Sequence, residues 1–299
     1  MKLSYYIFAV LLVGHGFNSK AQSNFLDSKE AYLGQAPPGD TLEIFGKGLL
    51  ADSGIVLGRV AFSKDGKEFY YGYARHWFDF NGTGIKEIVY EGKAWGKPKV
   101  LVENLANATF SIDGNQLYFG GQNSDVWVSQ RHGNGWSKPV PFLNKKYGLY
   151  NFQPSKSGLY YTGSNGMNGS KRDYSTYDFC TLSIAKGDTV IKSLGSPLNT
   201  AGFDGDFYIA PDESYIIISA NETKTYECEL YISFRNADKS WTIPKSLGPK
   251  INDGLAHRFG QFVSPDGKYL FYTKGTGEKD CNFYWVRFDT LLNKLKKEN

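Results

Sequence analysis

The clearest hydrophobic pattern in the chain is a polar turn followed by a short run of aromatic and aliphatic residues. Residues 263–274 read Val-Ser-Pro-Asp-Gly-Lys-Tyr-Leu-Phe-Tyr-Thr-Lys. Pro265 fixes φ at the first corner, Asp266 can accept hydrogen bonds from backbone N–H groups ahead of it, and Gly267 can adopt a positive φ. The run Tyr269–Tyr272 is too short for a helix and does not alternate with polar residues, which predicts a strand covered on both faces.

This pattern of turn and strand occurs five times along the chain. Four copies are clear, and a fifth, near Phe152, has Lys156 and Ser157 where the others have Asp-Gly or a similar pair. Successive turns are 42 to 57 residues apart when they are counted at Asp65, Asp113, Ser155, Asp212 and Asp266. A four-stranded propeller blade takes about 40–50 residues. The repeat therefore predicts an all-β, five-bladed β-propeller, with six blades as the alternative if the long third repeat contains another.

The expected blades span residues 59–102, 109–143, 151–194, 206–247 and 260–288. The last of these has only three predicted strands, because residues 289–299 read as a helix with Leu291, Leu292 and Leu295 on one face. Residues 40–49 read as a strand with no neighbouring partner in the sequence. We expect this strand to complete the fifth blade and close the ring, so that the propeller spans residues 40–288.

The N-terminal residues differ in composition from the rest of the chain. Residues 1–21 combine Lys2, an apolar run over 5–13 and a small-x-small motif that ends at Ala21, which predicts a signal peptide cleaved after Ala21. The protein is then expected in the periplasm or outside the cell. Residues 22–39 are polar, contain Pro-Pro-Gly and are expected to form a leader. No later segment approaches the roughly 20 apolar residues that a membrane-spanning helix needs.

Composition and charge narrow the function classes. The 21 Tyr, 21 Phe and 34 Gly agree with an all-β protein. The formal net charge of +4 is spread along the chain, apart from a basic run within residues 294–297, so we expect no nucleic-acid surface.

Two sets of conspicuous residues are expected to be structural. The first comprises Cys180, Cys228 and Cys281, which have no C-x-x-C spacing and should lie too far apart for disulfides, so free and buried thiols are expected. The second set consists of the tryptophans of a repeated Trp-x-x-Pro motif in the outer hairpins, at 95, 136 and 241. Packing explains their regular placement better than sugar stacking, which is the alternative.

Two motifs together resemble the WD40-like β-propeller repeats of secreted bacterial proteins, of which the TolB-type propeller is the best-known example. They are Ser-Pro-Asp-Gly-Lys-Tyr-Leu-Phe-Tyr at 264–272, and Glu-Leu-Tyr-Ile-Ser-Phe-Arg at 229–235 followed by Ser-Trp-Thr-Ile-Pro at 240–244. The resemblance covers about residues 40–288. It implies a secreted or periplasmic propeller with a protein-interaction role, and it brings no catalytic residues to this chain. The third repeat departs from the pattern, so that blade is expected to be irregular.

The loops that join the second strand to the third, and each blade to the next, should open on one rim of the ring. They carry polar and aromatic residues of the kind that line binding sites for sugars, peptides or carboxylates. The candidate binding residues are Arg75, His76, Trp77, Asp79, Arg172, Asp173, Tyr174, Asp204, Asp206, His257 and Arg258. The arginines could bind an anion, and the Asp and His residues could support acid/base chemistry or bind a cation.

Two function classes remain open from the sequence. The first is an exported, non-catalytic propeller that binds a protein or glycan partner through this rim, as a monomer and without a cofactor. The alternative is a carbohydrate-active hydrolase or lyase that uses rim Asp and His residues, with or without a divalent cation. A Ser/His/Asp triad is not indicated, since no Gly-x-Ser-x-Gly motif occurs. Convergence of Asp204, Asp206, His76 and His257 in one concave site would favour catalysis, and their dispersal would leave only binding.

Overall fold

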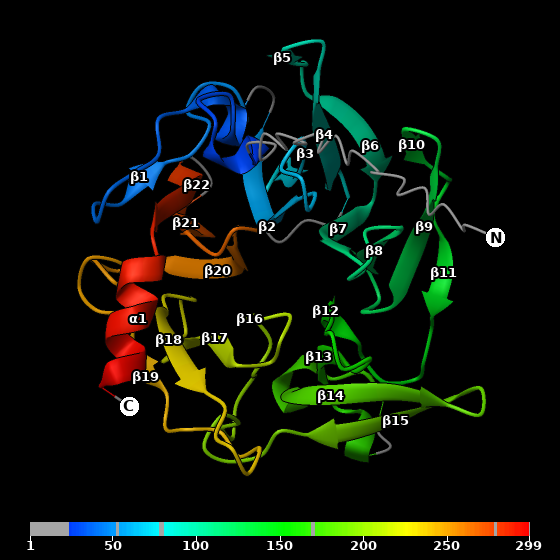
Figure 1. Cartoon of the computed structure of the whole chain (residues 1–299). Coiled ribbons are helices and arrows are strands. Elements are labelled where there is room, and N and C mark those ends of the chain that lie inside the picture. Colours follow the sequence, from blue (N-terminus) through cyan, green and yellow to red (C-terminus); the bar gives the residue numbers. More distant parts are fainter. Residues whose placement is uncertain (1–23, 52–53, 78–80, 169–170, 278–279, 299) are drawn as a thin grey trace, which may run out of the picture.

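A computed structural model describes residues 24–51, 54–77, 81–168, 171–277 and 280–298. Its strands form five small antiparallel sheets, arranged in a ring around a central axis (Figure 1). The chain is therefore a five-bladed β-propeller, as the repeat predicts, and the third repeat supplies one blade only. The signal peptide expected at residues 1–21 lies outside the described residues.

The first four blades each use four consecutive main strands, and the first strand is the innermost. The first blade consists of β2 (Ile55–Phe62), β3 (Glu68–Ala74), β4 (Gly84–Glu91) and β6 (Lys99–Glu103), with β5 (Ala94–Trp95) extending its outer hairpin. The second consists of β7 (Leu105–Phe110), β8 (Gln116–Gly121), β9 (Val126–His132) and β11 (Val140–Leu143), with β10 (Gly135–Trp136). The third consists of β12 (Tyr150–Pro154), β13 (Tyr160–Ser164), β14 (Asp178–Ala185) and β15 (Asp188–Ser193). The fourth consists of β16 (Phe207–Ile209), β17 (Tyr215–Ala220), β18 (Glu229–Phe234) and β19 (Lys245–Ser246).

The fifth blade is built from both ends of the chain. It joins β20 (His257–Val263), β21 (Tyr269–Gly277) and β22 (Asp280–Arg287) to β1 (Glu43–Ile44) from the N-terminal region. Glu43 pairs with Trp285 and Ile44 with Tyr284. The predicted closing strand is thus confirmed, but it is shorter than residues 40–49 because Gly46, at a φ of 61°, begins a turn in which the Leu49 N–H bonds back to the Gly46 carbonyl.

The residues expected to form a polar leader are part of the fold. Two short 3-10 helices, η1 (Phe25–Asp27) and η2 (Tyr32–Gly34), precede β1. Tyr32 is 1% exposed, and its ring lies 5.1 Å from that of Tyr269 and 5.6 Å from that of Trp285. Aromatic burial of this kind gives the leader a fixed position between the first and fifth blades.

At the other end of the chain, α1 (Asp289–Lys297) follows β22, as predicted. Its residue Leu295 is buried in a hydrophobic cluster with Tyr215 and Phe288, while Lys294 and Lys297 are exposed. The helix therefore covers the fourth and fifth blades with one apolar face. Among the described residues, no helix has the length and hydrophobicity needed to cross a bilayer.

The turns that define the repeat have the hydrogen bonds that the sequence suggests. Asp65, Asp113 and Asp266 each accept a bond of 2.5 to 2.6 Å from the hydroxyl of the serine two residues earlier, and each also accepts one from a backbone N–H. The third turn lacks this Asp. There the Ser155 hydroxyl donates to Glu213, 2.6 Å away in the next blade, so a neighbouring carboxylate replaces the missing one.

The repeated tryptophans join neighbouring parts of the ring. The Trp136 indole donates to the Tyr70 hydroxyl of the preceding blade at 2.8 Å, and Trp241 is buried in a cluster with Tyr161 of the preceding blade. Trp95 of the first blade donates to the Glu30 carbonyl of the leader at 2.6 Å. These contacts account for the tryptophans by packing.

Candidate functional site

The inner strands approach one another closely on the axis because four of them are bulged. The pairing register shifts within β2, β7, β12 and β20, and each bulge contains a residue with positive φ: Gly58, Asn107, Asn151 and Gly260. A Cβ at Gly260 would lie 2.1 Å from the Gly58 carbonyl oxygen, so only glycine allows this approach. Bulges of this kind redirect side chains, and here they bring polar groups to the axis.

Arg59 occupies the axis and connects all five blades. Its side chain is 1% exposed and donates to one acceptor on each of the other four inner strands. The acceptors are the Gln261 carbonyl at 3.2 Å, Thr109 Oγ1 at 3.1 Å, the Phe207 carbonyl at 2.7 Å and Asn151 Oδ1. Burial lowers the pKa of Arg59 to about 10, and the charge of Asp206 opposes that shift. Arg59 thus remains a cation at neutral pH, and it divides the channel into two halves.

The two ends of the channel differ in the segments that surround them. We call the end with the loops between the second and third strands, and between blades, the loop face. The other end carries the Asp-Gly turns and α1, and we call it the turn face. The rim predicted from the sequence belongs to the loop face.

On the loop face, four residues form what we call the axial cluster: Tyr150, Asp206, Glu222 and His257. The Tyr150 hydroxyl donates to Asp206 Oδ1 at 3.3 Å. Burial raises the pKa of Asp206, and the charges of His257 and Arg59 oppose the rise. Burial also lowers the pKa of His257, and the charge of Asp206 opposes that shift. Glu222 is exposed along its side chain, yet desolvation of its carboxyl and the charge of Asp206 raise its pKa to about 7.

Aromatic rings flank the axial cluster. The ring of Tyr174 lies 6.0 Å from that of Tyr150, and the ring of Phe203 lies 5.8 Å from it. On the other side, Trp77 lies 6.4 Å from the His257 ring. Carboxyl, hydroxyl and imidazole groups beside aromatic rings are typical of a site for a polar ligand with apolar faces. The axial cluster and its flanking rings bring together Trp77, Tyr174, Asp206 and His257 from the predicted set. They add Tyr150, Phe203 and Glu222, which the sequence did not indicate.

Other predicted residues have structural roles. Arg258 is 1% exposed and donates to five backbone carbonyls, among them those of Cys228 and Ile251. Arg172 donates to the Tyr147 and Lys145 carbonyls and to Asn144, which fixes the long loop of the third blade. Neither guanidinium faces the axial cluster as a free anion-binding group, because their donors hold loops in place.

The remaining predicted residues lie away from the cluster. Asp204 is buried and accepts two bonds from Thr200, and Asp173 caps the 3-10 helix Tyr174–Thr176. Arg75 and His76 are exposed, and Arg75 lines a separate cavity of 300 Å³ with Tyr73 and Glu103. Asp79 lies outside the described residues. Some of the predicted residues therefore lie at the axis, while the others either form hydrogen bonds within loops or are exposed away from the axis.

No group of three or more His, Cys, Asp or Glu side chains suited to a metal ion occurs within the described part of the chain. The three cysteines are buried and free, as predicted. Cys228 lies beneath the axial cluster, with its sulfur 3.8 Å from His257 Nδ1.

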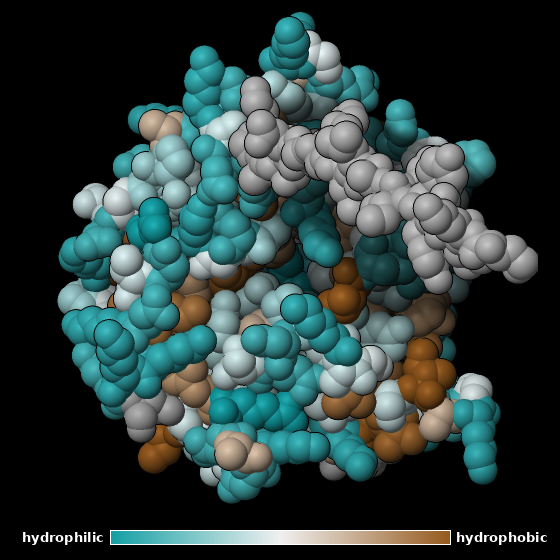
Figure 2. Space-filling view, viewed as in Figure 1, coloured by the Kyte–Doolittle hydropathy of each residue, from teal (hydrophilic) through white to brown (hydrophobic). Residues whose placement is uncertain are grey.

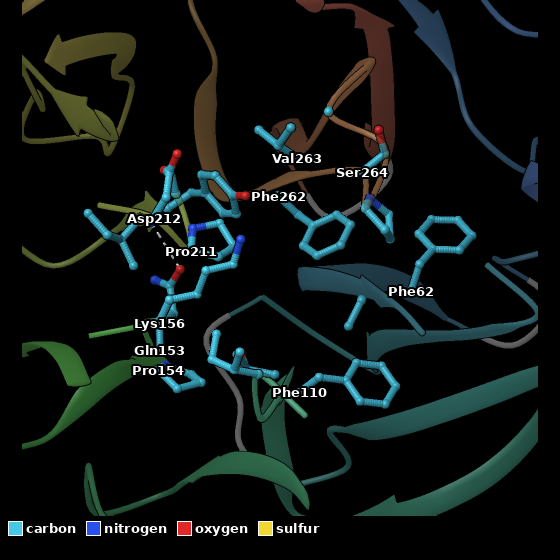
Figure 3. Close-up of a pocket in the computed structure, with 18 of the residues that line it drawn as sticks. Phe62, Phe110, Gln153, Pro154, Lys156, Pro211, Asp212, Phe262, Val263 and Ser264 are labelled. Carbon is cyan, nitrogen blue, oxygen red and sulfur yellow. Dashed lines mark hydrogen bonds between the residues drawn. The ribbon is translucent and has the colours of Figure 1, made fainter. Parts of the chain in front are cut away.

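The turn face contains a larger cavity, which the sequence did not indicate. It measures 540 Å³, and the nearly fully buried side chains of Arg59 and Gln153 line its inner end. The aromatic rings of Phe62, Phe110 and Phe262 line it (Figure 3), and a hollow is visible at the centre of the ring in Figure 2. We call this the turn-face cavity. Its lining residues come from the inner strands, from the turns that follow them, and from Leu292 and Lys296 of α1. The sequence predicts only hairpin corners at these turns, so it gives no sign of a cavity.

Comparison with known proteins finds structural similarity at low sequence identity and identifies no family. No protein-family model matches the chain, and no curated protein matches it in sequence. Many solved structures are similar in fold. A putative TolB from Agrobacterium tumefaciens has a TM-score of 0.46 and 12% identity, with 79% of this chain and 78% of that chain covered.

Two further structures show the range of proteins with a similar fold. TolB from Acinetobacter baumannii has a TM-score of 0.41 and 12% identity, over 78% of this chain and 54% of that one. An oligogalacturonate lyase from Vibrio parahaemolyticus has a TM-score of 0.42 and 13% identity, over 85% of this chain and 72% of that one. The chain spans less than two-thirds of the length of several structures that it matches. The chain is similar to these structures at low identity, and its assignment as a β-propeller depends on the five sheets described above.

Proposed function

We propose that this protein is a non-catalytic binding propeller of the WD40-like, TolB-like type that holds a glycan over the loop-face mouth of its channel. The observation that carries the proposal is the axial cluster, in which Asp206 accepts a hydrogen bond from Tyr150 and is influenced by the charges of Arg59 and His257. The expected signal peptide leads us to propose that it acts in the periplasm or outside the cell.

The chemistry of the cluster fits a sugar better than a charged ligand. Hydroxyl groups of a sugar donate well to carboxylates, and the apolar face of a pyranose stacks on aromatic rings. Asp206 and Glu222 supply acceptors, while Tyr174, Phe203 and Trp77 supply rings. A strongly anionic ligand would be repelled by the two carboxyl groups once both are ionised. The same site could instead bind a protein partner, which would insert a side chain with a hydroxyl or amide group into the axial cluster.

The experiment is isothermal titration of the purified protein with a panel of neutral oligosaccharides. Wild type is expected to bind at least one of them, and Asp206→Asn to weaken that binding about tenfold or more, because a charge-assisted hydrogen bond contributes roughly 1.5–3 kcal/mol. Asp188→Asn, on an exposed strand of the third blade, is the matched control and should bind as wild type does. Binding that Asp206→Asn leaves unchanged would exclude the axial cluster, and absence of any binding would exclude the glycan.

A carbohydrate hydrolase or lyase is the second candidate, and Glu222 favours it. A carboxyl with a pKa of about 7 is suited to general acid catalysis near neutral pH, and Asp206 lies close enough to affect it. Against this, Asp204 is tied to Thr200 and is not a second reactive carboxylate at the mouth. Release of reducing ends or of unsaturated products from a bound oligosaccharide, abolished by Glu222→Gln while binding persists, would establish catalysis.

A further inference from the structure

We propose that the turn-face cavity is a second binding site, which takes an organic anion with an apolar body, such as an aryl-alkyl carboxylate. It lies on the opposite side of Arg59 from the axial cluster and shares no residue with that cluster. The proposal is therefore independent of the glycan site on the loop face.

The size and walls of the cavity suit a small apolar group. Its volume of 540 Å³ falls within the roughly 300–1,000 Å³ of small-molecule sites. Phe62, Phe110 and Phe262 come from the first, second and fifth blades (Figure 3). Tyr208 adds a ring from the fourth blade. Rings from four directions would surround a flat or aliphatic body on several sides, which favours aromatic and aliphatic groups.

The inner end of the cavity needs no polar group from a ligand. Arg59 already donates to four acceptors, and the Gln153 amide donates to the Phe207 carbonyl at 2.9 Å while its oxygen accepts from the Ile209 N–H at 3.2 Å. Because these groups are satisfied, the deepest part of the site favours the apolar end of a ligand.

The hydroxyl groups of the lining are also engaged. Thr109, Ser111, Ser214 and Ser264 each donate a hydrogen bond to a neighbouring protein oxygen. A sugar in this cavity would leave most of its hydroxyl groups without partners, and unpaired buried hydroxyls are unfavourable. The turn-face cavity is thus chemically different from the loop-face site.

Cations surround the cavity and define the charge of the ligand. The lining includes Lys64, Lys156 and Lys296, and none of these ammonium groups forms an ion pair with another described residue. Arg59 adds a fourth positive charge, and Asp212 is the single acidic lining residue. Burial opposes ionisation of Asp212, but hydrogen bonds from Ser214 and the charge of Lys156 outweigh it and lower its pKa. The net positive charge favours an anion at the mouth.

The test is isothermal titration with three probes: 4-phenylbutyrate, its neutral amide, and acetate. Wild type should bind 4-phenylbutyrate, bind the amide more weakly and show no detectable binding of acetate, since both charge and apolar body are needed. Binding of 4-phenylbutyrate should also weaken between 20 mM and 500 mM NaCl, because exposed charges are screened by salt.

Ile112 provides a matched pair of variants. It lines the cavity, is 42% exposed and lies in a turn, so substitution should leave the fold intact. Ile112→Glu should weaken 4-phenylbutyrate binding roughly two- to fivefold and Ile112→Lys should strengthen it by a similar factor, the range that one exposed charge pair supplies. Unfolding temperatures of both variants report whether the fold is retained.

The outcomes separate the two sites. Opposite effects of the Ile112 variants, with Asp206→Asn unchanged, would support the turn-face site even if no glycan binds on the loop face. Equal binding of the amide, identical effects of Glu and Lys at position 112, sensitivity to Asp206→Asn, or no binding of 4-phenylbutyrate at millimolar concentration would each overturn it.

Discussion

Arg59 Nε donates a hydrogen bond of 3.2 Å to the backbone carbonyl of Gln261, a residue 202 positions later in the chain. This contact joins the first blade to the last across the axis, and the same guanidinium reaches the three blades between them. The closed ring is therefore stabilised at its centre by Arg59, and also at the outer edge of the fifth blade, where β1 pairs with β22.

Arg59→Met should be strongly destabilising. The substitution removes the donor to the buried Gln261 carbonyl and to buried Asn151 Oδ1, whereas the Phe207 carbonyl keeps its bonds from Asn151 and Gln153. Each unsatisfied buried group costs about 1–3 kcal/mol. We expect a loss of at least about 3 kcal/mol in the free energy of unfolding, measured by urea denaturation. Arg172→Met, an arginine that holds a loop at the surface, is the control and should cost less. A loss below about 1 kcal/mol for Arg59→Met would show that the axial contacts contribute little.

Tyr32→Ala tests whether the leader is part of the fold. The ring is fully enclosed by Phe62, Tyr269 and Trp285, so its removal leaves a cavity between two blades. Aromatic-to-alanine substitutions in cores cost about 3–5 kcal/mol. Leu49→Ala, at a side chain 38% exposed, is the comparison and should have a small effect. Equal stability of the two variants in thermal and urea denaturation would mean that residues 24–39 add nothing to the core.

Asp204 should make stability depend on pH in the acidic range. Burial raises its pKa to about 6, although hydrogen bonds from Thr200 oppose the rise. Between the unfolded pKa, about 4, and this folded value, Asp204 binds more protons in the folded state than in the unfolded state. The contribution of Asp204 to stability is therefore greatest at low pH and is lost as pH rises.

The measurement compares wild type with Asp204→Asn from pH 4 to pH 7. The free energy of unfolding of wild type should fall relative to that of the variant by up to about 3 kcal/mol over this range and then remain constant. A difference between the two proteins that does not change with pH would show that Asp204 has an ordinary pKa in the folded state.

The three thiols should be unreactive in the native protein. Burial raises the pKa of Cys228 to about 12 and that of Cys281 to about 11, and it raises the pKa of Cys180 further. Since the thiolate is the nucleophile, Ellman's reagent at pH 8 should label no thiol in native protein and three in guanidinium chloride. Rapid labelling of native protein would indicate that a blade edge opens easily.

Most of the fold could be predicted from the sequence because the information is local and repeated. The Asp-Gly turns at Asp65, Asp113 and Asp266 form the hydrogen bonds that their residues suggest, and each strand follows at the expected place. The third turn could be recognised only as irregular, because its carboxylate comes from Glu213 in another blade. Glu213 lies 58 positions after Ser155, so the sequence of the turn itself cannot show this hydrogen bond.

The site was harder to predict, since charge alone does not show what a side chain contacts. Arg172 and Arg258 looked like anion-binding groups, yet their donors bind loop carbonyls. The sequence places Arg59 only at the start of the first blade, and its position on the axis depends on a bulge that contains Gly58. Gly58 corresponds to Asn107, Asn151 and Gly260 in the other repeats. An alignment of the repeats at these positions could have predicted the bulges, and with them the placement of Arg59 next to one. The burial of Tyr32 was not predicted, because the residues around it are mostly polar and the segment was expected to lie outside the core.

The pairing of Glu43 and Ile44 with Tyr284 and Trp285 also bears on synthesis. Among the described strands, β1 is synthesised first and its partner β22 last. The ring can therefore close only after β22 has emerged from the ribosome. A message truncated before codon 284 would encode a product with two unpaired strand edges, a state that favours aggregation and degradation over persistence.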